Sequence, residues 1–219
     1  MGMRETDSAR LVALFEQIRE RQARDEEQTN YKDAPALHEM AAIIRPYAAR
    51  LPAEDADALG DIGAVCQFLG RSYQEMFRGV YAAEFYTAAF YAGVLQAQAE
   101  GKAMENAEEL LSAAVKARNF YVDDDCAGLK EAALQVLTAE EVARIATAAS
   151  RRTLKRDSVE MTEGYLAVID EVERKVEENM DFHGRGSCHQ RWSLTREYLE
   201  EYGIVWRSLG AMNPRFHFD

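Results

Sequence analysis

The stretch AEDADALGDIGAVCQFLGRSYQEMFRGVYAAEFYTAAFYAGVLQAQAE, residues 53–100, decides the fold. It contains no proline and is rich in alanine, which favours helix. It is too long for one helix in a compact domain, and Gly70 and Gly79 offer places to turn. Six aromatic residues cover more than one face, which is typical of a central helix packed in the core, with an aromatic-lined ligand pocket as the alternative. These six are Phe77, Tyr81, Phe85, Tyr86, Phe90 and Tyr91.

The sequence outward from this stretch predicts an all-α protein. No proline occurs between Pro52 and Pro214, and alternating apolar and polar runs with β-branched residues are nearly absent. We expect eight to ten antiparallel helices, either as an irregular bundle or as a short helical-repeat solenoid. We expect residues 1–219 to form a single domain, with the aromatic tail 204–219 packed on its body.

Several helix boundaries are predicted from capping residues and prolines. A Thr138–Glu141 capping box predicts a helix start, because each side chain can bind a free backbone amide of the other residue. Gly203 stands where a left-handed C-terminal cap would end a helix. The other expected limits are a first helix from Asp7 or Ser8, a second from Pro35 with a kink or early end at Pro46, a helix begun by Asp123–Asp125, and helices over Asp157–Met180 and Ser187–Tyr202.

Charge argues against nucleic acid as a partner. The chain has 26 Lys and Arg against 38 Asp and Glu, a formal net charge of −12. An acidic surface repels phosphates and anionic lipid. Arg151, Arg152, Lys155 and Arg156 form a local exception, which we interpret as a solvated helix end, because cations suit a helix C-terminus.

The predicted compartment is the cytoplasm. The first residues lack the apolar core and cleavage site of a signal peptide, and no apolar run approaches the length of a membrane helix. Three widely spaced cysteines, Cys66, Cys126 and Cys188, do not suggest a disulfide framework and fit a reducing environment.

Within the deciding stretch, one spacing resembles the tetratricopeptide repeat, in which about 34 residues fold as two antiparallel helices. The resemblance covers about residues 66–94, and a generic helical hairpin is the alternative. Cys66 and Val94 depart from the family's pattern, and one such unit does not bury its own core. The residues that carry the resemblance are Leu69, Gly70, Tyr73, Ala82, Tyr86 and Ala89.

The resemblance implies protein binding. In such families the first helix of each unit lines a groove for an extended peptide. Carried over position by position, the partner-binding residues are Gln67, Arg71 and Gln74, with Ala64 beside them. The guanidinium of Arg71 is suited to pair with a carboxylate of the peptide. The alternative interpretation is that Arg71 is a solvated cation.

A second candidate site combines His183, Cys188 and His189. Imidazole and thiolate are good zinc ligands, although the spacing matches no recognised zinc signature, and neighbouring residues of a helix point about 100° apart. Cys188 is also a candidate nucleophile near a helix N-terminus, with a histidine as base. A packed thiol and solvated histidines are the alternative.

No motif in the sequence identifies a function, so three hypotheses remain open. The first is a protein-interaction module that binds a protein or peptide and needs no cofactor. The second is an enzyme or metal-binding protein that uses Cys188, His189 and His183, although no catalytic set of residues is assigned. The third is a structural subunit of a homo-oligomer in which the tail from Trp206 to Phe218 contacts a neighbour.

Overall fold

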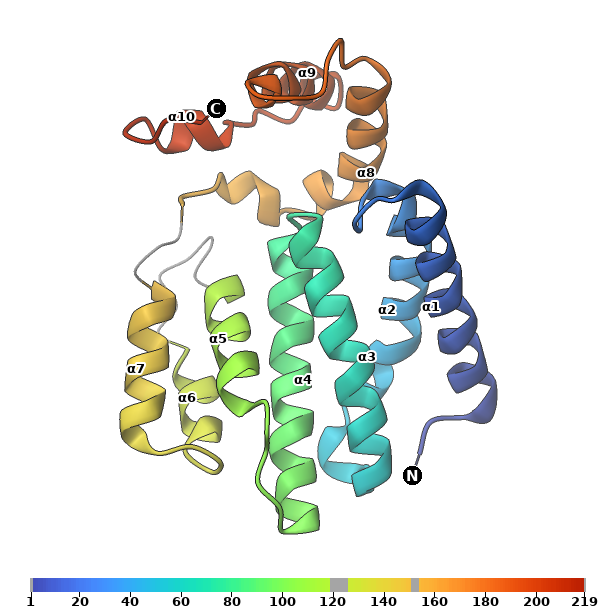
Figure 1. Ribbon diagram of the computed structural model, residues 1–219, viewed down its shortest axis with the longest axis vertical. Coiled ribbons are helices and arrows are strands. Elements are labelled where there is room, and N and C mark those ends of the chain that lie inside the picture. The colour runs from blue at the N-terminus through green and yellow to red at the C-terminus, as the bar shows by residue number, and fades with distance from the viewer. Residues whose placement is uncertain (1, 119–125, 151–153, 219) are drawn as a thin grey trace. The chain divides into compact units, whose positions relative to one another are not determined.

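The computed structural model describes residues 2–118, 126–150 and 154–218, and these residues confirm the all-α class. They form ten α-helices and three short 3-10 helices, with no strand among them (Figure 1). Contacts divide the chain into two compact units, Met1–Thr153 and Leu154–Asp219, where the sequence had suggested one domain. No helix of the described ranges is both long and apolar enough to cross a membrane.

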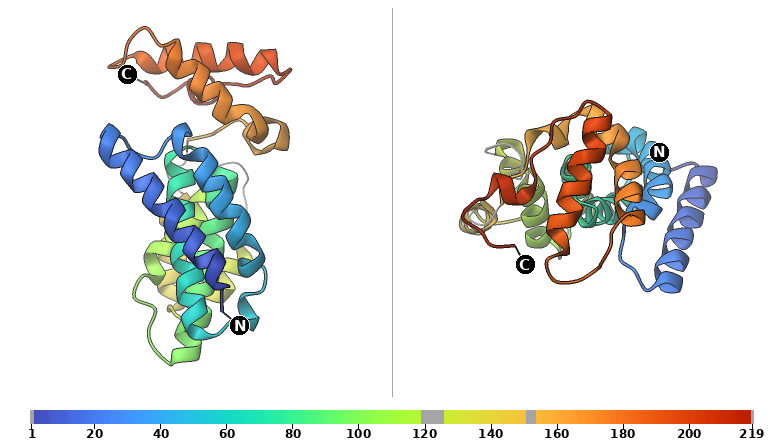
Figure 2. Two further views of the ribbon diagram at one scale, coloured as in Figure 1. Left: turned by 90° about the vertical axis from the view of Figure 1, so that its right-hand side faces the viewer. Right: turned by 90° about the horizontal axis from the view of Figure 1, so that it is seen from above.

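Unit 1 is built around two long helices, α3 (Ala56–Glu75) and α4 (Gly79–Glu100). They form an antiparallel hairpin, and α5 packs on another side of α4 (Figures 1 and 2). The remaining elements of the unit are α1 (Glu5–Asp25), η1 (Tyr31–Asp33), α2 (Ala34–Ala48), η2 (Leu51–Ala53), α5 (Ala107–Arg118), α6 (Ala127–Ala133) and α7 (Ala139–Ser150). Asp123–Asp125, Arg151 and Arg152 lie outside the described residues.

The turn of the hairpin follows α3 at Met76, Phe77 and Arg78. Phe77 has a left-handed backbone with φ of 57°. The N–H of Arg78 donates to the carbonyl of Tyr73 at 2.8 Å, and the N–H of Phe77 donates to that of Gln74 at 3.0 Å. This pair of bonds is the Schellman ending of a helix, in which glycine usually occupies the left-handed position. The chain therefore turns just before Gly79.

Gly70, the other expected turning point, lies inside α3. A Cβ atom at this position would lie 2.9 Å from the ring of Tyr86 on α4. The glycine therefore serves the close approach of the two helices and does not end a helix.

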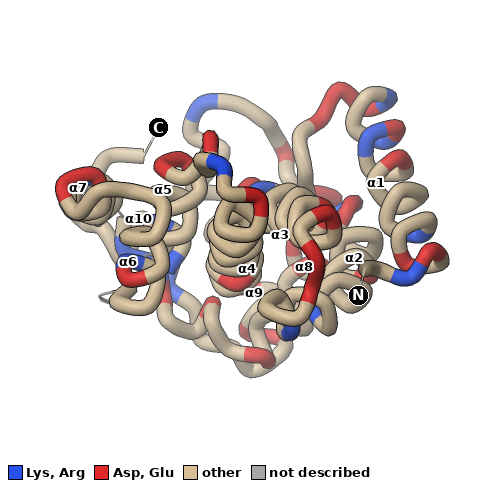
Figure 3. Tube along the Cα trace, turned by 90° about the horizontal axis from the view of Figure 1, so that it is seen from below, with Lys and Arg blue, Asp and Glu red and all other residues tan. Residues whose placement is uncertain are grey.

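The first two helices confirm some expected boundaries and correct others. Pro35 lies in the first turn of α2, as expected, and α2 ends two residues after Pro46. α1 begins at Glu5, before the expected Asp7 or Ser8, because the carboxylate of Asp7 accepts hydrogen bonds from the guanidinium of Arg4 at 2.9 and 3.0 Å. Basic and acidic residues alternate along α1 (Figure 3).

The capping box before α7 is confirmed. The N–H of Thr138 donates to the Glu141 carboxylate at 2.8 Å, and the N–H of Glu141 donates to the Thr138 hydroxyl at 3.3 Å. Two backbone amides at the start of α7 are thereby satisfied.

Unit 2 contains two packed helices, α8 (Glu163–Glu178) and α9 (Ser187–Glu201), with short elements η3 (Ser158–Met161) and α10 (Leu209–Met212). Gly203 has φ of 72° and follows the end of α9, as predicted. The helix expected from Asp157 begins only at Glu163, where Thr162 caps it. The buried core of unit 2 consists of Tyr165, Ile169, Val172, Val176, Leu199 and Trp206.

The tail is held to unit 2 by buried polar groups, which explains the late start of α8. The Glu160 carboxylate accepts hydrogen bonds from Nε1 of Trp206 at 2.9 Å and from Nε of Arg156 at 2.7 Å. The Asp157 carboxylate accepts from the backbone N–H of Arg207 at 2.8 Å. Asn213 exchanges hydrogen bonds with the backbone of Lys155. The residues before α8 thus bind the tail.

Candidate functional site

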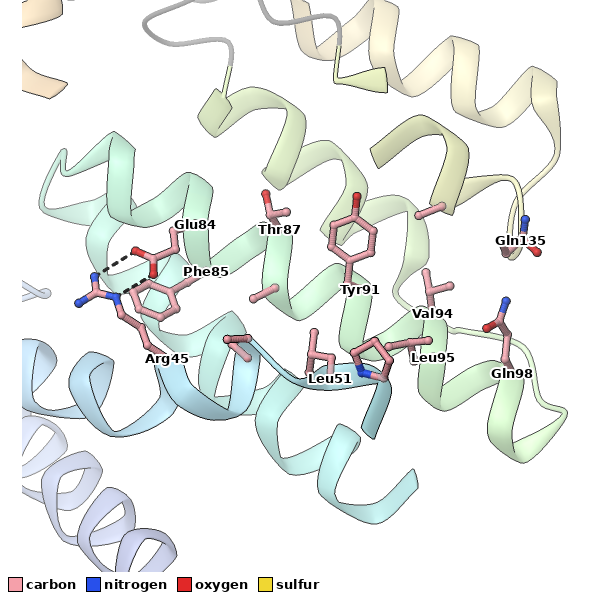
Figure 4. A pocket seen from close by; sticks show the side chains of 15 residues that line it. Arg45, Leu51, Glu84, Phe85, Thr87, Tyr91, Val94, Leu95, Gln98 and Gln135 are labelled. Atoms are coloured by element: carbon pink, nitrogen blue, oxygen red, sulfur yellow. Dashed lines mark hydrogen bonds and ion pairs between the residues drawn. The ribbon is translucent and has the colours of Figure 1, made fainter. Parts of the chain in front are cut away.

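A surface hollow in unit 1 lies along α4, and we name it the α4 pocket (Figure 4). Its volume is about 700 Å³, within the range of small-molecule sites. One wall comes from the end of α2 and from η2, the floor from α4, and the opposite wall from α6. The lining residues are Arg45, Ala48, Ala49, Leu51, Pro52, Glu84, Phe85, Thr87, Ala88, Tyr91, Val94, Leu95, Gln98, Ala132 and Gln135.

The floor is one continuous face of α4. Its lining residues recur every three or four positions between Glu84 and Gln98, which are about 21 Å apart along a helix axis. Between these ends the floor is mainly apolar, with Thr87, Ala88, Tyr91 and Leu95 partly exposed. α4 is apolar on every side, as expected for a fully buried helix. α3 and α5 each pack along α4, whereas this face opens into the pocket.

Polar side chains mark both ends of the α4 pocket (Figure 4). At one end Nε and Nη2 of Arg45 donate to the two carboxylate oxygens of Glu84 at 2.7 and 3.0 Å. The guanidinium also lies 5.4 Å from the ring centre of Tyr81 and 5.5 Å from that of Phe85. The hydrogen bonds with Glu84 raise the pKa of Arg45, which stays cationic. Gln98 and Gln135 line the other end.

A smaller hollow of about 300 Å³ lies between α1 and α3, and we name it the α1–α3 furrow. The rings of Phe15 and Phe68 meet edge to face across it, with centres 4.9 Å apart. Val12 on its α1 side is 59% exposed, so apolar surface is open to solvent there. Its lining residues are Met3, Ser8, Leu11, Val12, Phe15, Met40, Asp61, Ala64, Val65 and Phe68.

The structure places the four partner-binding candidates on one stripe of α3. Ala64, Arg71 and Gln74 are exposed and Gln67 is half-exposed. Ala64 lines the α1–α3 furrow, whereas the other three continue along the helix beyond it. The guanidinium of Arg71 forms an exposed ion pair with Glu75 at 3.1 Å. The stripe is therefore open to a partner and adjoins an apolar hollow.

A second exposed arginine lies near this stripe. The guanidinium of Arg19 lies 5.7 Å from the ring centre of Phe15. α1 and α3 run in the same direction (Figure 1). Arg19 and Arg71 are each about one turn beyond the contacting rings of Phe15 and Phe68. Both arginines therefore follow, along their helices, the two rings that meet in the furrow, and neither is among its lining residues.

The six repeat-like residues all belong to the interface of α3 and α4. Leu69 and Tyr73 are fully buried, and Gly70 contacts Tyr86. Ala82 and Ala89 are each 1% exposed. The pattern thus marks a closely packed helical hairpin, and membership of a repeat array stays a prediction.

The histidine and cysteine candidates in unit 2 are not assembled into a metal site. Nδ1 of His183 lies 3.7 Å from Oε1 of Glu177. Nε2 of His189 and Sγ of Cys188 lie 3.2 and 3.9 Å from the carbonyl oxygen of Phe218. Across the part of the chain that the structure describes, no group of three or more His, Cys, Asp or Glu could hold a metal ion. Cys188 and His189 instead bind the end of the tail.

The other two thiols are buried. Burial raises the pKa of Cys66 to about 12, so its sulfur is protonated at neutral pH. Cys126 is 3% exposed. A protonated, enclosed thiol is a packing group and a poor nucleophile.

The α4 pocket was missed as a site in the sequence, although the aromatic content of α4 had suggested a pocket as the alternative to core packing. Phe85 and Tyr91 line it, whereas Tyr86 and Phe90 are not among its lining residues. The sequence signal for this site is that α4 is apolar on every side. Since α3 and α5 cover only part of α4, another part of its apolar surface can line a pocket.

No protein-family model matches the chain, and no similar curated protein or solved structure was found.

Proposed function

We propose that the protein is an interaction module that binds a peptide segment of a partner protein along the α1–α3 furrow. The observation that supports this function is the apolar hollow beside Ala64, which adjoins the exposed stripe of Gln67, Arg71 and Gln74. A hollow lined by large apolar side chains can hold an anchoring side chain of a partner.

The two exposed arginines define the second requirement. Arg19 and Arg71 are exposed, and each lies about one helical turn beyond a ring of the Phe15–Phe68 pair in the furrow. Guanidinium binds carboxylate with two hydrogen bonds and a defined geometry. The preferred peptide therefore carries an apolar anchor for the furrow and an acidic residue about one helical turn or a few extended residues away.

A displayed library of random peptides tests the proposal. Peptides selected on the wild-type protein should share an apolar residue and an acidic residue, and their affinity is then measured by fluorescence polarisation. Ala64→Trp, which fills the furrow, should weaken binding by at least about tenfold. Arg71→Glu should abolish the preference for the acidic residue. Arg144→Glu, the same charge change on α7, is the matched control and should leave binding unchanged. Selected peptides that bind Ala64→Trp as well as wild type would refute the furrow as the site.

A homo-oligomeric function has one supporting observation. Val205 and Phe216 of the tail are 81% and 61% exposed, whereas Trp206 between them is buried. Their replacement together by serine should lower the mass in solution if the tail contacts a neighbour. The paired change leaves the Trp206–Glu160 contact intact, so an unchanged mass would exclude these side chains as the oligomer contact.

A further inference from the structure

The α4 pocket differs chemically from the furrow and lies outside the proposed peptide site. Its middle is formed mainly by alanine, leucine, valine and proline side chains, with the hydroxyl-bearing Thr87 and Tyr91 among them, and its charged or amide groups stand at the ends. A ligand that fits this arrangement has an apolar body and a polar head. The floor residues Ala88, Tyr91 and Leu95 have the composition of an interior face, so covering them with an apolar body removes apolar surface from water.

The dimensions exclude a helix as the body that fills the pocket. A helix with its side chains is about 10–12 Å across, and the pocket holds about 700 Å³ over a floor that extends for several helical turns. An extended peptide also fits poorly. Its backbone N–H and C=O groups would lie against apolar walls, and each unpaired group costs about 1–3 kcal/mol. A hydrocarbon chain has no such groups to satisfy.

The polar end identifies the head group. Glu84 occupies Nε and Nη2 of Arg45, while a guanidinium carries five N–H donors. The rings of Tyr81 and Phe85 hold the guanidinium at the end of the pocket. A carboxylate head at this end can accept from the remaining donors of Arg45, and the apolar chain then follows α4 toward Gln98.

We propose that the α4 pocket binds a straight-chain fatty carboxylate, with its head at Arg45 and its chain along Ala88, Tyr91 and Leu95. The site is independent of peptide binding at the α1–α3 furrow. Its ligand class follows from the pocket's volume, from its largely apolar floor and from Arg45, the one cation among its described lining residues, whose Nη1 is not used by Glu84.

Isothermal titration calorimetry with dodecanoate, below the concentration at which it forms micelles, tests the proposal. Wild type should bind with saturable heat at one site. Ala88→Trp fills the floor and should weaken binding by at least about tenfold. Ala64→Trp makes the same substitution in the furrow and should leave dodecanoate binding unchanged. Absence of saturable binding by the wild type, or equal binding by Ala88→Trp, would overturn the proposal.

A comparison with dodecanol separates the contribution of the carboxylate head from that of the hydrocarbon chain. The alcohol should bind wild type about tenfold more weakly than dodecanoate, and Arg45→Gln should remove that difference while retaining the chain's contribution. Urea unfolding of each variant shows that the fold is retained. Equal affinity of wild type for the acid and the alcohol would refute the assigned head group. Because Ala64→Trp and Ala88→Trp block different hollows, failure here and failure of peptide binding are distinguishable.

Discussion

Units 1 and 2 are stabilised in different ways. The core of unit 1 draws side chains from all seven of its α-helices. Unit 2 buries six large side chains and secures its tail with Asp157, Glu160 and Asn213, each of which is buried. A small core supplies little stabilisation, so directed hydrogen bonds and ion pairs must hold its parts in place.

The comparison teaches where binding surfaces arise. Unit 1 has more apolar surface than its helices cover, and this surface appears in the α4 pocket and the α1–α3 furrow. In unit 2 the Cys188 and His189 side chains contact the tail's Phe218. We therefore place both proposed binding sites in unit 1.

The largest expected effect concerns the core of unit 1. Phe90 on α4 is fully buried, so Phe90→Ala should lower the free energy of unfolding by about 3–5 kcal/mol. Urea unfolding followed by circular dichroism measures this change. The exposed Phe216 of unit 2 provides the control, since Phe216→Ala should change it by less than about 0.5 kcal/mol. Equal losses from both would contradict the assigned burial.

The next effect tests the polar attachment in unit 2. Glu160→Ala leaves the guanidinium of Arg156 and the indole N–H of Trp206 without their carboxylate. The loss of a buried ion pair should cost about 3 kcal/mol. Trp206→Phe retains an aromatic ring and removes one hydrogen bond. The loss of that bond should lower the free energy of unfolding by about 1 kcal/mol. Indole fluorescence during urea unfolding reports Glu160→Ala, and an unchanged midpoint would show that the tail is held by packing alone.

A smaller effect, of opposite sign, is expected at the hairpin turn of unit 1. Phe77 has a left-handed backbone and is 60% exposed. Phe77→Gly should stabilise the protein by about 1 kcal/mol, because glycine adopts this conformation without a Cβ clash. Phe77→Ala retains the Cβ atom and serves as the control. Thermal unfolding compares the two, and equal midpoints would show that the turn stores no strain.

The smallest effect is a pH dependence in unit 2. Burial by itself would raise the pKa of Asp157, but hydrogen bonds from Arg207 and from the N–H of Val159 outweigh it and lower this pKa. The stabilisation is therefore complete above the ordinary Asp pKa and is lost as pH falls below about 4. Acid titration of indole fluorescence should show the tail loosening. Asp157→Asn should reduce this pH dependence, and an identical titration curve would contradict the role of Asp157.

Much of the helical plan could be predicted because it depends on local chemistry. The Thr138–Glu141 box and the Gly203 cap involve residues close in sequence, and both were confirmed. The turn at Phe77 was not predicted, because an aromatic residue gives no local sign of a left-handed backbone. The late start of α8 was also missed. It depends on the contacts of Asp157 and Glu160 with tail residues about 50 positions away, which no local pattern reveals.

The site was only partly predictable. The repeat-like spacing identified one exposed stripe of α3, and its own six residues proved to be interface residues. The hollows that give this surface its chemistry require α1 beside α3, and η2 and α6 beside α4. Such pairings of helices distant in sequence are set by tertiary packing, so spacing within one helix does not predict them.

The most direct test of the central claim is to measure both ligands on the same two variants. The claim is that unit 1 carries two separate binding hollows. Ala64→Trp should lose the selected peptides and retain dodecanoate, and Ala88→Trp should retain the peptides and lose dodecanoate. If either substitution leaves both affinities unchanged, or if both substitutions weaken both ligands equally, the account of two independent sites in unit 1 is contradicted.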